Sequence, residues 1–154
     1  MGCDIHSHAE RKNADGKWEK VPDLQPFASR NYGTFGFLAD VRNYSDLTPI
    51  SQPRGVPQDV SLEVSEDYEA WGSDAHSASW LSVEELAAFD YEAQCEDRRV
   101  TRQVGPNAWN GGCTCNPGEG KQQTYREFLE RWFFEDLQKL QAAGAERVVF
   151  WFDN

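Results

Sequence analysis

The chain has 154 residues, a formal net charge of −11 at pH 7, and 39% hydrophobic and 13% aromatic side chains. This length and composition predict a single domain over 1–154 with a substantial core, and they exclude a disordered chain. The acidic balance disfavours binding to a nucleic-acid polymer, which needs a basic surface. Because the chain has neither an apolar run near the ~20 residues of a membrane span nor a recognisable signal peptide, we expect an intracellular protein that does not bind membranes.

The N-terminal part of the chain predicts a β-hairpin followed by a helix. Residues 3–10 alternate weakly, and an Asp15-Gly16 turn separates them from a second extended run at 17–21. Asp-Gly between two such runs is typical of a hairpin. Apolar side chains at helical spacing then predict a helix over 31–41, although two internal glycines weaken that prediction.

The middle of the chain predicts a loop and two short helices. Prolines and a glycine make residues 44–60 an irregular loop. Ser61 is placed to begin a short helix that ends before Gly72. Ser82 and Glu85 have the spacing of a capping box, which predicts the start of another helix.

The last third of the chain carries the strongest periodic pattern. Thr124 and Glu127 form a second capping box, and apolar side chains, Trp132 among them, follow at spacings of three and four until Gly144. Residues 147–152 are apolar on both faces, which predicts a central strand. Five glycines predict a flexible loop over 105–120. The fold class expected is α+β, with about four helices packed on one face of a small sheet that includes the N-terminal hairpin and the C-terminal strand.

Two of the three histidines occur in Asp-x-His pairs, Asp4/His6 and Asp74/His76. In an extended segment residues i and i+2 point to the same face, so each pair aims a carboxylate and an imidazole together. These four residues are candidate ligands for a divalent metal such as zinc or manganese. Each pair is also a candidate for contact with a bound small molecule. A third interpretation is purely structural, in which the Asp orients the His or caps a turn. His8 is the weaker candidate, because the residues after it predict a strand that leaves the core.

Three arginines in predicted loops or at helix ends are candidate phosphate ligands: Arg30, Arg42 and Arg54. A guanidinium fork matches a phosphate in two places, and aromatic side chains such as Tyr32 and Trp80 offer a face to a nucleotide base. The opposing interpretation is that arginines of an acidic protein pair with surface carboxylates.

The four cysteines predict reduced thiols in an intracellular protein. Cys113 and Cys115 are separated by one residue, which is tighter than the usual spacing of structural zinc sites, and Cys3 and Cys95 are isolated. The sequence has no Gly-x-Ser-x-Gly elbow that would support nucleophilic catalysis by a serine. It also has no phosphate-binding Gly-Lys-Ser/Thr loop.

The chain resembles an uncharacterised family of small phage and bacterial proteins that open Met-Gly-Cys-Asp-Ile-His and end Phe-Trp-Phe-Asp-Asn. The resemblance is carried by short motifs spread over the whole chain: Met1–His6, Arg30-Asn31-Tyr32, Val41-Arg42, Pro53-Arg54-Gly55, His76-Ser77, Ser79-Trp80 and Val149–Asn154. Relatives often have a second histidine where this chain has Ala78, so a mechanism that needs an imidazole at this position is in doubt.

These observations together predict a phage-type binding protein that encloses a small phosphorylated, nucleotide-like molecule. The resemblance adds the expectation that it sequesters a signal of host defence in the cytoplasm of a bacterial host. The residues expected to contact the ligand are Arg30, Tyr32, Arg42, Arg54, His76, Ser77, Trp80, Asp4 and His6.

Two other functions stay open on the sequence. The first is a metal-dependent phosphoesterase or nucleotide hydrolase that uses Asp4, His6, Asp74 and His76. The second is an acidic inhibitor that binds a host protein through its surface. The aromatic content is compatible with a homo-oligomer in each case.

Overall fold

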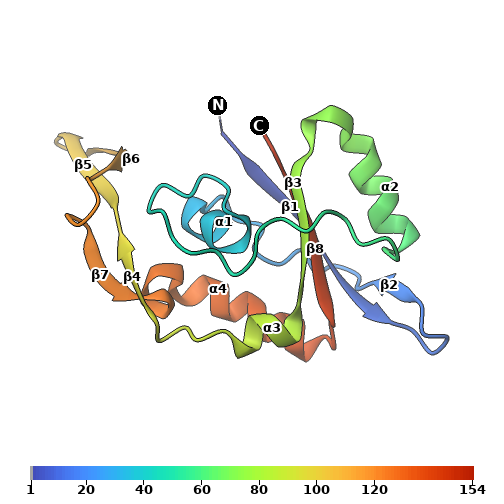
Figure 1. Ribbon diagram of the computed structural model, residues 1–154. Coiled ribbons are helices and arrows are strands. Elements are labelled where there is room, and N and C mark those ends of the chain that lie inside the picture. Colours follow the sequence, from blue (N-terminus) through green and yellow to red (C-terminus); the bar gives the residue numbers. More distant parts are fainter. Residues whose placement is uncertain (1) are drawn as a thin grey trace.

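The computed structural model describes residues 2–154, apart from the side chains of 101–102 and 109–113 (Figure 1). Its centre is an antiparallel four-stranded sheet with the order β2-β1-β8-β3. The strands are β1 (Asp4–Lys12), β2 (Trp18–Lys20), β3 (His76–Ser82) and β8 (Arg147–Asp153). The predicted α+β class is confirmed, and so is a sheet that includes the N-terminal hairpin and the C-terminal strand.

The predicted hairpin forms around a turn in which Gly16 has a φ of 74° and the Asn13 N–H donates to the carbonyl of Lys17 over 2.8 Å. β8 lies between β1 and β3, as its apolar faces predict. Its side chains alternate between the two faces of the sheet, and Val148 and Val149, which point in opposite directions, are both fully buried.

Four α-helices accompany the sheet in residues 2–154: α1 (Tyr32–Ala39), α2 (Leu62–Trp71), α3 (Val83–Ala88) and α4 (Tyr125–Ala142). α2 runs into a short 3₁₀ turn, η1 (Gly72–Asp74). Both capping boxes are present, at Ser82/Glu85 and at Thr124/Glu127.

The helices cover both faces of the sheet, so the expectation of a single covered face was wrong. α1, α3 and α4 pack over Phe150 and Phe152, whereas α2 packs over Trp151 on the opposite face (Figure 1). The reason lies in β8 itself, because a strand that is apolar on both faces needs a cover on each side.

Two small hairpin-like sheets extend from the end of α3 (Figure 1). β4 (Gln94–Asp97) pairs with β7 (Lys121–Thr124), and β5 (Arg99–Gly105) pairs with β6 (Ala108–Thr114). The stretch 105–120, which its glycines predict to be a loop, therefore contains a strand. Backbone pairing with β5 supplies the hydrogen bonds that the glycine-rich composition does not reveal.

α1 contains two glycines because its surroundings approach the helix closely. A Cβ atom at Gly36 would lie 2.8 Å from the Oδ1 atom of Asn43, and one at Gly33 would lie 2.9 Å from the ring of Phe128. Asn31 caps the helix by accepting a hydrogen bond from the Thr34 N–H over 3.2 Å.

α4 is not one regular helix. Glu130 has φ 65° and ψ 173°, which interrupts the helical conformation after the first turn and a half. Trp132, one of the apolar side chains at helical spacing, has 63% of its surface exposed, whereas Phe133 and Leu137 are buried. The interruption resets the helical phase, and the apolar spacing does not reveal it.

Candidate functional site

The structure places the predicted site residues in two main groups. Asp4, His6, Arg30, Tyr32 and Arg42 gather where β1 begins and β8 ends, close to both chain termini (Figure 1). We call this group the strand-end cluster. It also includes four residues that contact the group: Cys3, Tyr44, Asp153 and Asn154. Arg54 and Trp80 lie elsewhere, next to α3.

Arg30 is paired with Asp4 in two places. Its Nε and Nη2 atoms donate to the two carboxylate oxygens over 2.7 and 2.6 Å. This hydrogen bonding holds the pKa of Asp4 below its usual value. Since both side chains are about half exposed, a phosphate that approaches Arg30 competes with a single solvated carboxylate.

The ring of His6 is oriented by two neighbours, Asp153 and Trp71. Its Nε2 atom lies 2.9 Å from Oδ2 of Asp153, whose Oδ1 atom accepts the backbone N–H of Asp4 over 3.1 Å. The ring also lies 3.9 Å, centroid to centroid, from that of Trp71 at the end of α2. The Asp that orients His6 is thus Asp153 from β8, and Asp4 of the sequence pair turns to Arg30 instead.

Arg42 is the arginine of this cluster that carries an unneutralised charge. Its Nη2 atom donates to Oδ1 of Asn154 over 3.1 Å and its Nη1 atom to the hydroxyl of Tyr44 over 3.4 Å, and the bond with Tyr44 raises the pKa of Arg42. The guanidinium carbon lies 5.9 Å from the centre of the Tyr32 ring. Eight other arginines with described side chains form ion pairs with carboxylates, and Arg42 forms none with any residue that the structure describes.

A small hollow lies beside Arg42. Its volume is about 10 Å³, and Tyr32, Tyr44 and Arg99 are among the residues that line it. This space holds about one water molecule. A second guanidinium, that of Arg99, borders the hollow, although it is paired with Asp97 over 2.9 Å.

The guanidinium of Arg54 is held by contacts within the protein. Its Nη1 and Nη2 atoms donate to Glu85 over 2.9 and 2.6 Å, and Nη1 also donates to the carbonyl of Trp80 over 3.1 Å. The guanidinium stacks 4.9 Å from the Trp80 ring. Because Glu85 also closes the capping box of α3, Arg54 fastens the proline-rich loop to this helix.

The sheet separates His76 from His6. In the strand register His6 faces Trp151 and His76 faces Phe152, and neighbouring positions of β8 point to opposite faces. His76 stacks on Phe152 with the centroids 6.1 Å apart, and its Nδ1 atom lies 3.0 Å from the hydroxyl of Ser77, where a positive φ of 51° marks a bulge.

The candidate metal ligands are therefore not brought together as one set. Asp4 and His6 lie on one face of the sheet, while His76 lies on the other and Asp74 sits in the preceding turn. Among the side chains that the structure describes, no group of three or more His, Cys, Asp or Glu residues has the arrangement of a metal site. The Cys113/Cys115 pair includes Cys113, whose side chain lies outside the described residues.

His8 and Glu10 are two further polar residues on the same face of β1, and both are buried. His8 is only 4% exposed, so its predicted position in a strand that leaves the core was wrong, and its Nε2 atom lies 2.6 Å from Oδ2 of Asp67. Glu10 is fully buried and pairs with Arg147 over 2.8 Å. The available signal was the alternation of polar residues at 4, 6, 8 and 10, which places all four on one face.

Comparisons with protein-family models, with curated proteins and with solved structures find no match to this chain. Of the helices within residues 2–154, none is long and apolar enough to cross a membrane.

Proposed function

We propose that the protein binds a small phosphorylated molecule at the strand-end cluster, with Arg42 as the residue that holds the phosphate. The observation that carries this proposal is the unneutralised guanidinium of Arg42 in a protein with 26 acidic side chains. Its present partners are the neutral side chains of Tyr44 and Asn154, which a phosphate can replace without breaking an ion pair.

The neighbouring aromatic side chains favour a nucleotide-like ligand. Tyr44 has 49% of its surface exposed, and Tyr32 packs edge-on against it with ring centroids 6.0 Å apart. An exposed tyrosine beside an arginine offers a face to a base and a charge to a phosphate. Because the hollow between them holds about one water molecule, the ligand would lie on the surface here and not inside a closed cavity.

Binding without turnover is the form of this proposal that the geometry supports. Asp4 and His6 are each engaged with another residue, Arg30 and Asp153, and His76 lies across the sheet. Sequestration of a nucleotide signal of host defence remains the proposed role, and it rests on the resemblance to phage proteins.

The test is to incubate the protein with cyclic dinucleotides, cyclic trinucleotides and ADP-ribose derivatives, remove free ligand, and identify the material released on heating by mass spectrometry. A nucleotide recovered intact supports a binding protein. In the Arg42→Gln variant we expect the affinity for it to fall about tenfold or more, because a charge-assisted hydrogen bond contributes about 1.5–3 kcal/mol.

Two other arginines serve as matched controls. Arg131 is exposed and pairs with Glu135 on α4, so Arg131→Gln removes one charge and should leave the affinity unchanged. Arg54→Gln should lower the melting temperature and also leave the affinity unchanged. An Arg42→Gln variant that retains wild-type affinity contradicts the proposed site, and recovery of hydrolysis products contradicts binding without turnover.

A further inference from the structure

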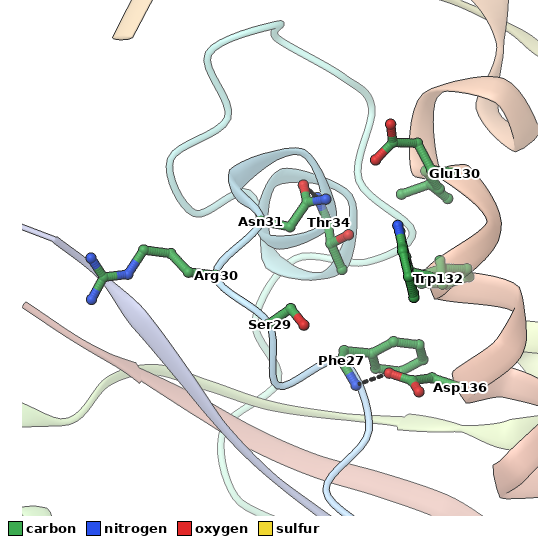
Figure 2. Close-up of a pocket in the computed structure, with 10 residues that line it drawn as sticks. Phe27, Ser29, Arg30, Asn31, Thr34, Glu130, Trp132 and Asp136 are labelled. Atoms are coloured by element: carbon green, nitrogen blue, oxygen red, sulfur yellow. Dashed lines mark hydrogen bonds between the residues drawn. The ribbon is translucent and has the colours of Figure 1, made fainter. Parts of the chain in front are cut away.

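A separate cavity of about 330 Å³ lies between the start of α1 and the interruption in α4 (Figure 2). Ser29, Asn31 and Thr34 border it on one side, and Glu130 and Trp132 border it on the other. This volume is at the lower end of the range of ~300–1,000 Å³ that is usual for small-molecule sites. Arg30 is the one residue of the strand-end cluster that also borders this cavity, and Tyr32, Arg42 and Tyr44 are not among its lining residues.

Two strained backbone positions border this cavity. Glu130 has φ 65° and ψ 173°, a conformation that is almost restricted to glycine and costs about 1–3 kcal/mol. Phe27 has a φ of 61°, and its N–H donates to Oδ2 of Asp136 over 2.7 Å. An unbroken α4 would avoid the strain at Glu130, so the strain is not explained by the stability of the helix.

The interruption has a clear consequence for the cavity wall. It leaves Trp132 63% exposed and places its indole ring at the cavity, while Phe133 beside it stays in the core. Figure 2 shows Trp132 and Glu130 across from Asn31 and Thr34. The cavity thus has an aromatic wall on the α4 side and hydroxyl and amide groups on the α1 side.

The charges at this cavity are negative. Glu130 is exposed, and its carboxylate forms no hydrogen bond or ion pair with the residues that the structure describes. Asp136 adds a second carboxylate, which accepts the N–H of Phe27. Lys139 lies 3.2 Å from Asp136. Arg30 also borders the cavity, but its guanidinium points away from it and pairs with Asp4 (Figure 2). The helix that restarts after Glu130 contributes only about half a positive charge, less than the full charge of this carboxylate.

We propose that this cavity binds a small organic cation, in which an ammonium group pairs with Glu130 and an aryl or alkyl body packs against Trp132 and Phe27. A carboxylate without a partner favours a cation, and the face of an indole ring attracts one as well. The apolar side chains of Phe133 and Leu129 complete a surface for the body of the ligand.

The probe is phenethylammonium, compared with phenylacetate and phenethyl alcohol, which have a similar body and a negative or no charge. Binding is followed by the indole N–H resonance of Trp132, assigned with a Trp132→Phe variant. We expect phenethylammonium to shift this resonance saturably, and the two other compounds to bind about tenfold more weakly or not at all. Equal binding of phenylacetate, or no saturable shift with phenethylammonium, overturns the proposal.

Two variants identify the residues responsible. Glu130→Gln removes the charge and retains the side-chain size, and it should weaken phenethylammonium binding about fivefold or more. The matched control is Glu63→Gln on α2, an exposed acid outside the cavity, which should bind as wild type. If Glu130→Gln does not fold, Trp132→Ala changes an exposed side chain and, by ligand-detected NMR, should also weaken binding. Wild-type affinity in either folded variant counts against the cavity as the site.

Discussion

Glu10 and Arg147 form an ion pair that is almost completely shielded from water, with exposed side-chain fractions of 0% and 5%. Glu10 also accepts the backbone N–H of Ser61 over 2.8 Å, and Arg147 pairs with Asp59 and lies 3.7 Å from the ring of Trp18. The pair joins β1 to β8 at the end of the sheet opposite the strand-end cluster. Both partners need each other, because a buried charge without its partner is strongly unfavourable.

Glu10→Ala should therefore lower the free energy of unfolding by about 3 kcal/mol, because it leaves Arg147 buried with only Asp59. Replacement of both Glu10 and Arg147 by Met should recover much of this loss, since an apolar pair of similar volume needs no charge compensation. Urea denaturation of the single and double variants measures the difference. A double variant as unstable as the sum of its single variants would contradict the expected coupling.

Cys3 and Cys95 provide a second check on single residues. Burial raises the pKa of the Cys95 thiol to about 11 and also raises the pKa of Cys3. Because the thiolate is the reactive form, we expect both residues to react slowly with iodoacetamide in the native protein and quickly in urea. Peptide mass spectrometry gives the rate at each cysteine. Similar native and unfolded rates at Cys95 would show that its thiol is not protected.

α4 shows how a helix with strong local signals acquires an irregular position. Its capping box and apolar spacing set the start and the buried face, and both act within a few residues. The break at Glu130 follows instead from contacts with the rest of the protein, since glutamate has no intrinsic preference for a positive φ. α4 is thus two helical segments that meet at Glu130, beside the cavity between α1 and α4.

Glycine should be the better residue at this break. In an ordinary helix interior glycine is about 1 kcal/mol less favourable than alanine. At a positive φ the order reverses, so Glu130→Gly should be more stable than Glu130→Ala by about 1 kcal/mol or more. Thermal denaturation of the two variants tests this order, and an alanine variant of equal or higher stability would mean that α4 is continuous in solution.

The stability of the whole molecule depends on pH through carboxylates that their partners hold ionised. Hydrogen bonds and ion pairs lower the pKa values of five of them: Asp4, Asp59, Glu85, Glu96 and Asp97. A carboxylate with a lowered folded-state pKa stabilises the protein at pH values above its unfolded-state pKa. This stabilisation is lost as the pH falls through the folded-state pKa.

The free energy of unfolding should accordingly be nearly constant around neutral pH and fall once the pH drops below about 4, where unfolded carboxylates begin to bind protons. Urea denaturation at a series of pH values measures this dependence. The Arg54→Gln variant should lose less stability on acidification than wild type, because Arg54 is the largest cause of the lowered pKa of Glu85. An identical pH dependence in both proteins would contradict that role of Arg54.

The sequence by itself determined the elements whose signals are local. The Asp15-Gly16 turn predicted the hairpin, the two capping boxes predicted the starts of α3 and α4, and the apolar run at 147–152 predicted a central strand. These signals act between residues a few positions apart, so they can be read without knowing the fold.

Only the tertiary structure decided which polar residues meet. His6 and His76 carry the same Asp-x-His pattern, yet the register of β3 against β8 puts them on opposite faces. Arg42 and Arg54 were both candidate phosphate ligands in the sequence, but one meets neutral partners and the other a carboxylate. Such differences depend on contacts between distant parts of the chain, and no local pattern encodes them, because the partner of a side chain is set by how the strands and helices pack.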